Sequence, residues 1–195
     1  MTVERSLGNA WFAAVSFAGI YRRLVLLERR LDIPVPDVTV DPAFRVALLM
    51  DGERAAYLEF RPDQDVVEVT RRLDRGDHCF ATWQEQRIVH AAWAATGRAW
   101  IEYVSRELPL AADDVYVYDS FTRPEFRGRG AAPLRARVLG QYFAARGYAR
   151  VLTAVLQENA AGFRPLEKVG TRPVGTIGYI GIGPWRRHFV RRRPR

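Results

Sequence analysis

Apolar residues in this chain fall into short alternating or continuous stretches, separated by stretches with helical spacing. Strands are predicted at 44–50, 78–84, 87–96, 150–156, 172–182 and 185–192, with a central strand beginning at Val115. Helices are predicted at 53–60, 63–76, 131–147 and 159–169. The chain order of strand, two helices, three strands, helix, strand, helix and two strands predicts a mixed α/β (α+β) domain.

Two stretches fit more than one structure. From Phe17 to Leu31 the apolar residues recur every three or four positions, as on one side of a helix, but YRRLVLLERRL is also typical of a strand with a buried middle. Both alternatives remain open. Prolines then predict an extended connector over residues 32–42. Residues 100–105 are either an additional strand or the end of the preceding hairpin, and residues 107–114 are predicted to form a loop.

The apolar stretch Arg150–Leu156 is typical of a strand buried on both faces of a sheet. A helix at 131–147 separates it from the strand that begins at Val115, so the two strands should be parallel neighbours. The apolar spacing predicts the buried side of that helix as Leu134, Val138, Gln141 or Tyr142, and Ala145.

The turn between the central strand and this helix, at about residues 123–130, has the composition of an anion-binding site. Gly128 and Gly130 allow close approach of the backbone, and the free N–H groups of the first helical turn point toward a ligand. Arg127 and Arg129 add permanent positive charge. The alternative is a solvent-exposed turn. The dinucleotide fingerprint G-x-G-x-x-G is excluded by Pro133, and no Gly-Lys-Ser/Thr of a P-loop occurs.

The sequence RGRGAA at 127–132 matches R/Q-x-x-G-x-G/A, and it therefore resembles the GNAT superfamily of acyl-CoA-dependent N-acyltransferases. The preceding PEFR at 124–127 is similar to the family's usual lead-in, and the resemblance extends over about residues 40–190. It implies a twisted, mostly antiparallel sheet with a central parallel pair of strands that splay apart, and flanking helices. The coenzyme-binding residues that it implies are Phe121, Thr122, Arg127, Gly128, Arg129, Gly130, Ala131, Ala132 and Asn159.

For the chemistry, the resemblance implies direct attack of an amine on the thioester in a ternary complex. A backbone N–H near Phe121 or Thr122 would stabilise the oxyanion. The general acid Tyr that family members often carry falls on Leu166 here, and the central strand has no Glu. We therefore rank Asp119 first and Tyr118 second as catalytic residues. Asp119 could instead pair with an arginine.

Asn159 also has an alternative role, as the N-cap of the helix that follows it.

The composition is that of a globular protein: 195 residues, 48% hydrophobic and 27% charged. No apolar stretch approaches the ~20 residues that span a bilayer, and no signal peptide is expected.

The single cysteine, Cys79, excludes an intramolecular disulfide. His78, Cys79 and His90 suggest a metal site or a Cys–His nucleophile only weakly, because no fourth ligand is near and Cys79 lies in an apolar strand. We expect a cytoplasmic protein without a metal and without a membrane partner.

Six of the eight net positive charges lie in the last ten residues, and this predicts an Arg-rich end at 186–195. The expected organisation is an N-terminal extension and connector at 1–39, an acyltransferase domain at 40–185, and this end. Acetyl-CoA or another acyl-CoA is the expected co-substrate, and a small-molecule or peptide amine is the expected acceptor. The alternatives are a non-catalytic acyl-CoA sensor and a nucleic-acid binder that uses the arginines, although a solvated end is the commoner role for such a run. A homodimer is left open.

Overall fold

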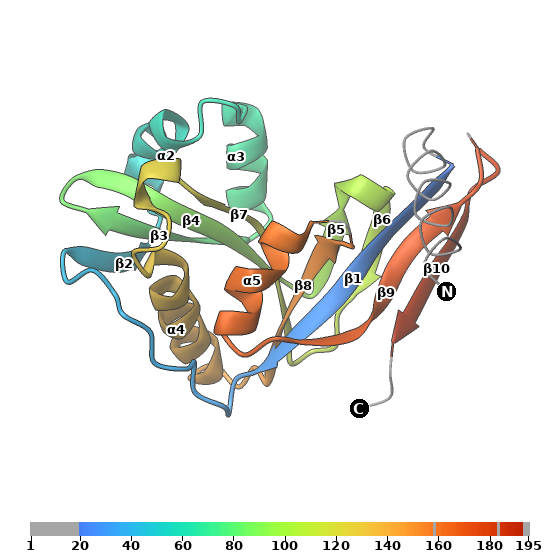
Figure 1. Cartoon of the computed structure of the whole chain (residues 1–195). Helices are drawn as coiled ribbons and strands as arrows, with labels where there is room; N and C mark the ends of the chain where they lie inside the picture. Colours follow the sequence, from blue (N-terminus) through green and yellow to red (C-terminus); the bar gives the residue numbers. More distant parts are fainter. Residues whose placement is uncertain (1–19, 158, 183, 193–195) are drawn as a thin grey trace, which may run out of the picture.

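A computed structural model describes residues 20–157, 159–182 and 184–192. Its main element is an eight-stranded sheet in the order β10-β9-β1-β8-β7-β4-β3-β2 (Figure 1). The strands are β1 Tyr21–Arg30, β2 Phe44–Leu48, β3 His78–Gln84, β4 Arg87–Thr96, β7 Asp114–Thr122, β8 Arg150–Leu156, β9 Arg172–Ile180 and β10 Arg187–Arg192. Seven neighbouring pairs hold the sheet together, and only β7–β8 is parallel. The predicted mixed, mostly antiparallel sheet with a central parallel pair is confirmed.

The helices form a layer on each face of the sheet. They are α2 Arg54–Phe60, α3 Val66–Asp74, α4 Ala131–Ala144 and α5 Ala160–Lys168, with short 3₁₀ turns at Asp51–Glu53, Glu102–Val104 and Pro124–Phe126. One core cluster joins α2 and α3 to side chains such as Trp93, while a second joins α4 to the alternate side chains, such as Ala92 and Val117. Because alternate strand residues point to opposite faces, α2–α3 and α4 lie on opposite sides of the sheet.

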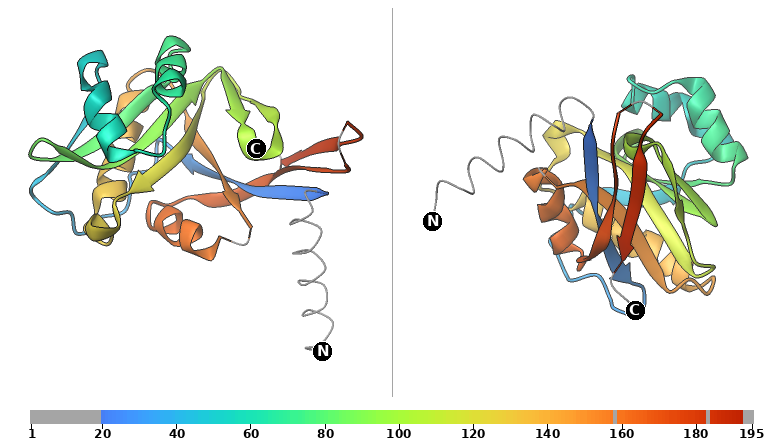
Figure 2. Two further views of the ribbon diagram at one scale, coloured as in Figure 1. Left: turned by 90° about the horizontal axis from the view of Figure 1, so that it is seen from above. Right: turned by 90° about the vertical axis from the view of Figure 1, so that its right-hand side faces the viewer.

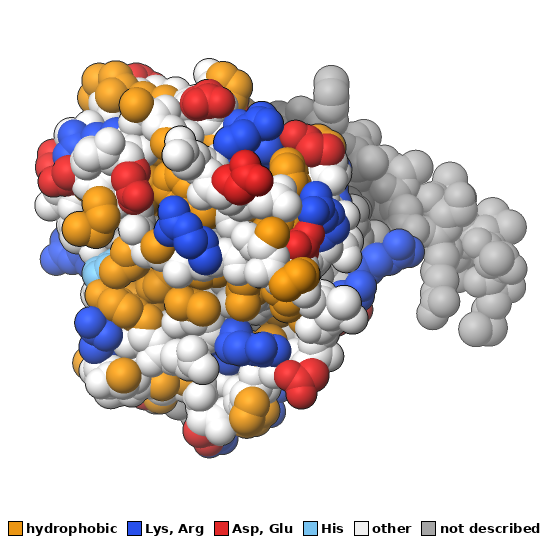
Figure 3. Space-filling view, turned by 90° about the vertical axis from the view of Figure 1, so that its left-hand side faces the viewer, with side chains coloured by type: hydrophobic (Ala, Val, Ile, Leu, Met, Phe, Trp, Pro, Cys, Tyr) orange, Lys and Arg blue, Asp and Glu red, His pale blue; other side chains and the backbone are white. Residues whose placement is uncertain are grey.

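Figure 3 views these layers from the β2 edge of the sheet, the left-hand side of Figure 1. Apolar side chains form a band across the middle of this face, and charged side chains lie above and below it. Residues 46–48 of β2 are only partly buried, as expected for an edge strand. No helix in the described ranges combines the length and apolar character needed to cross a membrane.

The stretch with two interpretations forms a strand. β1 lies between β8 and β9 and pairs antiparallel with both, with Leu24, Leu26 and Leu27 almost fully buried. A strand in the interior of a sheet buries both faces, so its apolar residues do not alternate strictly and can imitate helical spacing. The predicted boundary at residue 39 therefore divides a single sheet. Phe17 lies outside the described residues.

Residues 98–109 form a separate hairpin, β5 Arg98–Ile101 with β6 Arg106–Pro109. The predicted loop at 107–114 is thus wrong over its first three residues, because Glu107 pairs with Trp100 across the hairpin. Ala99, Ile101 and Leu108 pack with residues of β1 and β9 in one core cluster. Figure 2 shows the hairpin beside β9 and β10, on the side of the sheet that carries α3.

The predicted buried side of α4 is wrong. The buried residues are Ala131, Arg135, Ala136, Leu139, Gly140 and Phe143. Leu134, Val138 and Tyr142 are half-buried, and Gln141 and Ala145 are exposed. Apolar spacing misplaced this side because small residues and one arginine, rather than large apolar residues, form most of the surface against the sheet.

The strand predicted at 185–192 is confirmed, and within the described part of the Arg-rich end Arg186, Arg187 and Arg191 are exposed, as expected for a solvated end. Arg187–Arg192 forms the edge strand β10, which pairs with β9 along its whole length. β9 is irregular, because the partner of β1 changes from Gly175 to Pro173 between Leu26 and Leu27 and leaves Val174 as a bulge. Residues 193–195 lie outside the described ranges.

Candidate functional site

The two parallel strands at the centre of the sheet pair only at their first residues. Asp114, Val115 and Tyr116 lie opposite Arg150, Val151 and Leu152, and no pairing follows. β7 continues to Thr122 in partnership with β4, and β8 continues to Leu156 in partnership with β1. The sheet therefore opens between its two halves (Figure 1). The edge of β7 that faces this opening has backbone groups without a strand partner from residue 117 onward.

A bulge distorts β7 beside this opening. Ala91 lies opposite Phe121 and Trp93 lies opposite Tyr118, so Asp119 and Ser120 together face the single residue Ala92. Asp119 has a φ of +47°, a left-handed conformation that is uncommon for a residue other than glycine. The extra residue leaves backbone groups without a cross-strand partner and re-aims the side chains around it. Such a feature costs stability and is typical of functional sites.

The glycine turn leads directly into α4. Gly128 and Gly130 have φ values of +79° and +85°, and Gly130 is the N-cap residue of the helix. Within the described part of the chain, the backbone N–H groups of residues 128–132 have no hydrogen-bond acceptor. These amides lie at the positive end of the 14-residue helix, an arrangement that favours an anion, and coenzyme binding at this turn remains a prediction.

Arg129 is held by the connector rather than left free. Its guanidinium pairs with the Asp41 carboxylate and lies over the rings of Phe44 and Phe126. The Asp41 N–H donates to the Arg129 carbonyl at 3.1 Å. A hydrogen bond from the Ala43 N–H and the pairing with Arg129 lower the pKa of Asp41. These contacts tie the turn to the connector, so a direct role for Arg129 in coenzyme binding remains a prediction.

Arg127 is not held in this way. Its side chain is exposed, and no ion pair involves it among the residues that the structure describes. Its charge is therefore available to an anion beside the free amides.

Asn159 caps α5. Its Oδ1 accepts a hydrogen bond from the Gly162 N–H at 3.0 Å, as its alternative role predicts. A Cβ at position 162 would lie 2.7 Å from Asn159 Nδ2, so the glycine makes room for the capping amide. The coenzyme contact implied for Asn159 remains a prediction.

Asp119 is bound by two arginines. Arg61 Nη1 donates to Oδ1 at 2.7 Å and Arg72 Nη1 donates to Oδ2 at 2.6 Å. The pairing with arginine, which the sequence left open, is therefore observed. Both carboxylate oxygens already accept hydrogen bonds from guanidinium groups, and this geometry argues against Asp119 as the general base.

Sequence reasoning missed Arg61, which follows α2, and Arg72 of α3, because arginine in or beside an amphipathic helix usually faces solvent. Both side chains are more than nine-tenths buried. Arg61 also pairs with Asp63 at 2.8 Å, and Arg72 pairs with Glu68 at 3.2 Å.

Tyr118 donates its hydroxyl to Asp77 Oδ2 at 2.7 Å, and Asp77 also pairs with Arg75. Burial and the nearby Asp77 carboxylate raise the pKa of Tyr118 above its ordinary value. The phenol therefore stays protonated at neutral pH, and its proton is directed at Asp77 rather than at the opening in the sheet.

Both predicted catalytic residues line a cavity of about 550 Å³ on the α3 face of the sheet. Tyr116, Tyr118 and Asp119 of β7 lie on one side of it, with α3 and the β5–β6 hairpin around it. The exposed ring of Trp100 and the carboxylates of Glu102 and Glu107 come from the hairpin region. This cavity reaches the bulge of β7 from the face opposite to α4.

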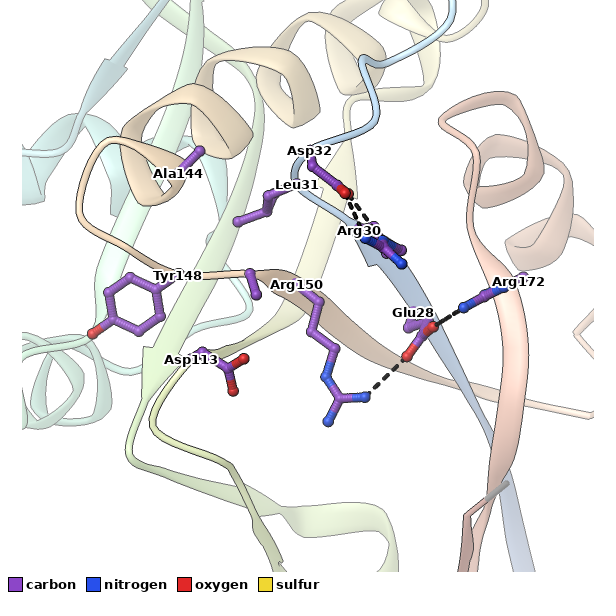
Figure 4. A pocket seen from close by; sticks show the side chains of 10 residues that line it. Glu28, Arg30, Leu31, Asp32, Asp113, Ala144, Tyr148, Arg150 and Arg172 are labelled. Carbon is purple, nitrogen blue, oxygen red and sulfur yellow. Dashed lines mark hydrogen bonds and ion pairs between the residues drawn. The ribbon is translucent and has the colours of Figure 1, made fainter. Parts of the chain in front are cut away.

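A second cavity, of about 460 Å³, lies at the other end of the central strands, next to Asp113 and Arg150 (Figure 4). Glu28 in its wall pairs with Arg150 at 3.0 Å and with Arg172 at 2.7 Å. This is the end at which β7 and β8 remain paired, so the cavity is remote from the glycine turn.

No group of potential metal ligands occurs within the described ranges. Cys79 is buried, and burial raises the pKa of its thiol well above the ordinary value. A thiol in that state is a poor nucleophile, which disfavours the Cys–His alternative.

Solved structures of acetyltransferases share this architecture. A protein from Novosphingobium aromaticivorans described as an acetyltransferase of the GNAT family superposes with a TM-score of 0.54 at 21% identity, over 81% of this chain and 62% of that one. The GCN5-related N-acetyltransferase of Sphaerobacter thermophilus superposes with a TM-score of 0.59 at 14% identity, over 86% of this chain and 54% of that one. The chain has the GNAT fold.

This chain thus spans little more than half the length of those two GNAT structures. The aminoglycoside N-acetyltransferase AAC(6')-Iy in complex with CoA is shorter, and the match covers 65% of this chain and 90% of that one, with a TM-score of 0.53 at 13% identity. No family model matches the sequence. No curated protein matches it either.

Proposed function

We propose that this GNAT-fold chain belongs to the GNAT superfamily and is an N-acyltransferase that moves an acetyl or other acyl group from acyl-CoA to a primary amine. One observation carries the proposal. The unoccupied amides of residues 128–132 lie at the start of α4, directly after a strand whose parallel partner has moved away. An anion held by those amides would belong to a ligand that can extend along the free edge of β7.

Coenzyme A has the chemistry that this geometry requires. Its diphosphate would accept hydrogen bonds from the amides of residues 128–132, with Arg127 close by. Its pantetheine arm carries amides that can pair with the free backbone of β7 near Phe121 and Thr122. Asn159 and Arg129 would support the site from α5 and from the connector.

The amine acceptor would enter from the opposite face, through the cavity beside Tyr118 and Asp119. The two substrates would then meet at the bulge of β7 in a ternary complex. The amine nitrogen attacks the thioester carbon and forms the C–N bond, the C–S bond breaks and releases the CoA thiolate, and that thiolate takes up the proton lost from nitrogen. A backbone N–H at Phe121 or Thr122, aimed at the oxyanion, is worth about 3 kcal/mol in such a step.

The acceptor is proposed to be a small molecule or a peptide with a primary amine. The similarity to an aminoglycoside N-acetyltransferase favours a small molecule. The single cysteine is buried, and we place the reaction in the cytoplasm on that ground.

The test combines calorimetry with acetyl-CoA and thiol-release assays over a panel of aminoglycosides, polyamines and peptides. Binding of acetyl-CoA with turnover on at least one amine is the expected result. Absence of any binding to acetyl-CoA and to free CoA would refute the proposal.

A second candidate is a sensor that binds acyl-CoA without turnover. The ion-paired Asp119 and the Leu166 in place of a general acid favour it. Binding without turnover on any amine of the panel would select this alternative.

A further inference from the structure

Arg135 is a buried cation without a carboxylate. Its side chain projects from α4 toward the sheet and is 7% exposed. Its Nε donates to His90 Nε2 at 3.2 Å, and its Nη2 lies 3.5 Å from Ser120 Oγ. Neither partner is an anion, and no carboxylate pairs with Arg135 in the part of the chain that is described. Burial of this charge without a counter-ion is costly for the fold, as expected where a charged residue serves a function.

His90 continues the chain of hydrogen bonds. It is fully buried on β4, and its Nδ1 lies 2.8 Å from Thr122 Oγ1. A guanidinium can only donate, so the Nε2 of His90 must be the acceptor and the ring hydrogen must lie on Nδ1. Burial and the charge of Arg135 also lower the pKa of His90 well below its ordinary value. The imidazole is therefore neutral with its orientation fixed.

Thr122 is the last residue in this series of hydrogen bonds. Since His90 Nδ1 donates to it, its oxygen is the acceptor and its own hydroxyl hydrogen is left to donate elsewhere. No acceptor for that hydrogen is found among the described residues. Thr122 is the last residue of β7, on the stretch that faces the opening in the sheet, and the glycine turn follows a few residues later.

We propose that Arg135, His90 and Thr122 form a charged relay that presents the Thr122 hydroxyl as a hydrogen-bond donor to a carbonyl oxygen of the acyl-pantetheine arm. The inference rests on the proposed function, since that arm belongs to acyl-CoA. Thr122 would touch the ligand, whereas His90 and Arg135 are positioning residues. The charge of Arg135 polarises the hydrogen bonds from Arg135 through His90 to Thr122, which makes the Thr122 hydroxyl a stronger hydrogen-bond donor.

Two kinds of carbonyl group have the required chemistry, those of the two pantetheine amides and that of the thioester. Calorimetry with free CoA and with acetyl-CoA separates them, because only acetyl-CoA contains the thioester. For Thr122→Val we expect a loss of affinity of about tenfold, the size of one charge-assisted hydrogen bond. A loss for both ligands assigns the amide, and a loss confined to acetyl-CoA assigns the thioester.

Three further variants test the relay. Arg135→Met should lower the affinity as Thr122→Val does, the double variant should be no weaker than either single variant, and Arg135→Lys should recover part of the loss. Thr96→Val, at the far end of β4, is the matched control and should bind as the wild type does. Nitrogen NMR of the His90 ring should show a neutral ring with hydrogen on Nδ1 in the wild type, and should show that preference lost in Arg135→Met.

The outcomes separate the two proposals. If the wild type binds neither CoA nor acetyl-CoA, the proposed function fails. If it binds them and Thr122→Val binds as well as Thr96→Val, or if the His90 hydrogen lies on Nε2, the relay alone is refuted.

Discussion

Asp119 forms ion pairs with two buried arginines at the bulge of β7. Its carboxylate lies between the buried guanidinium groups of Arg61 and Arg72, and its backbone forms the bulge of β7. We therefore expect it to stabilise the site rather than accept a proton. Replacement by Asn would leave two buried cations without their shared partner, which typically costs about 3 kcal/mol of unfolding free energy.

Denaturant unfolding of Asp119→Asn measures that cost. Asp63→Asn is the matched control, because it removes a carboxylate from the same Arg61 but is 61% exposed. We expect at most about 1 kcal/mol there. The pH profile of kcat/KM then shows whether Asp119 is the general base. If it is, the acidic limb of that profile should disappear in Asp119→Asn. An unchanged limb in Asp119→Asn supports a structural role, and its disappearance contradicts one.

Gly128 and Gly130 differ in a way that the motif does not reveal. Both have positive φ, but a Cβ at Gly130 would lie 2.4 Å from the Thr39 carbonyl oxygen, while a Cβ at Gly128 would meet nothing within 4 Å. Gly128→Ala should cost about 1 kcal/mol for its backbone conformation alone. Gly130→Ala should cost clearly more and should also displace the connector. Equal thermal stabilities of the two variants would contradict this account of the turn.

At the scale of elements, local signals were sufficient for most of the fold. Apart from the β5–β6 hairpin, the strands and helices from residue 44 onward and the glycine turn before α4 depend on neighbours in sequence, and they are confirmed. The position of β1 could not be predicted, because its partners β8 and β9 lie more than a hundred residues away. The ion pairs of Asp119 and the burial of Arg135 depend on the same long-range packing.

The position of β1 predicts how the chain responds to truncation. A chain beginning at residue 40 would lose an interior strand, leave β8 and β9 without their common partner, and remove the buried Leu24, Leu26 and Leu27. We expect no cooperative unfolding transition in circular dichroism from such a chain. Within the full chain, Leu26→Ala should cost about 2–5 kcal/mol. A truncated chain that folds cooperatively would show that β1 is dispensable.

At the scale of the whole molecule, the connector that follows β1 is joined to the glycine turn through Asp41 and Arg129. The pKa of Asp41 is lowered in the folded chain, so its contribution to stability is fully present above the unfolded carboxyl pKa of about 4 and is lost as the pH falls through the folded value. Melting temperatures between pH 6 and pH 3 should therefore fall less steeply in Asp41→Asn than in the wild type. Identical slopes would exclude Asp41 as a contributor.

The two faces of the sheet also have different proposed roles, one in coenzyme binding and the other in acceptor binding. The free amides and the relay from Arg135 lie on the α4 side, while the cavity beside Asp119 lies on the α3 side. The opening between β7 and β8 is the place where ligands from both sides can meet.

The central claim is that the amides of residues 128–132 hold the diphosphate of an acyl-CoA. Amide resonances of the ¹⁵N-labelled chain, followed during titration with CoA and with pantetheine, test it most directly because pantetheine lacks the diphosphate. We predict large shifts of the resonances of Gly128 to Ala132 with CoA and small ones with pantetheine. CoA binding that leaves these resonances in place, or that shifts only residues around the cavity at Glu28 and Arg150, would contradict the account.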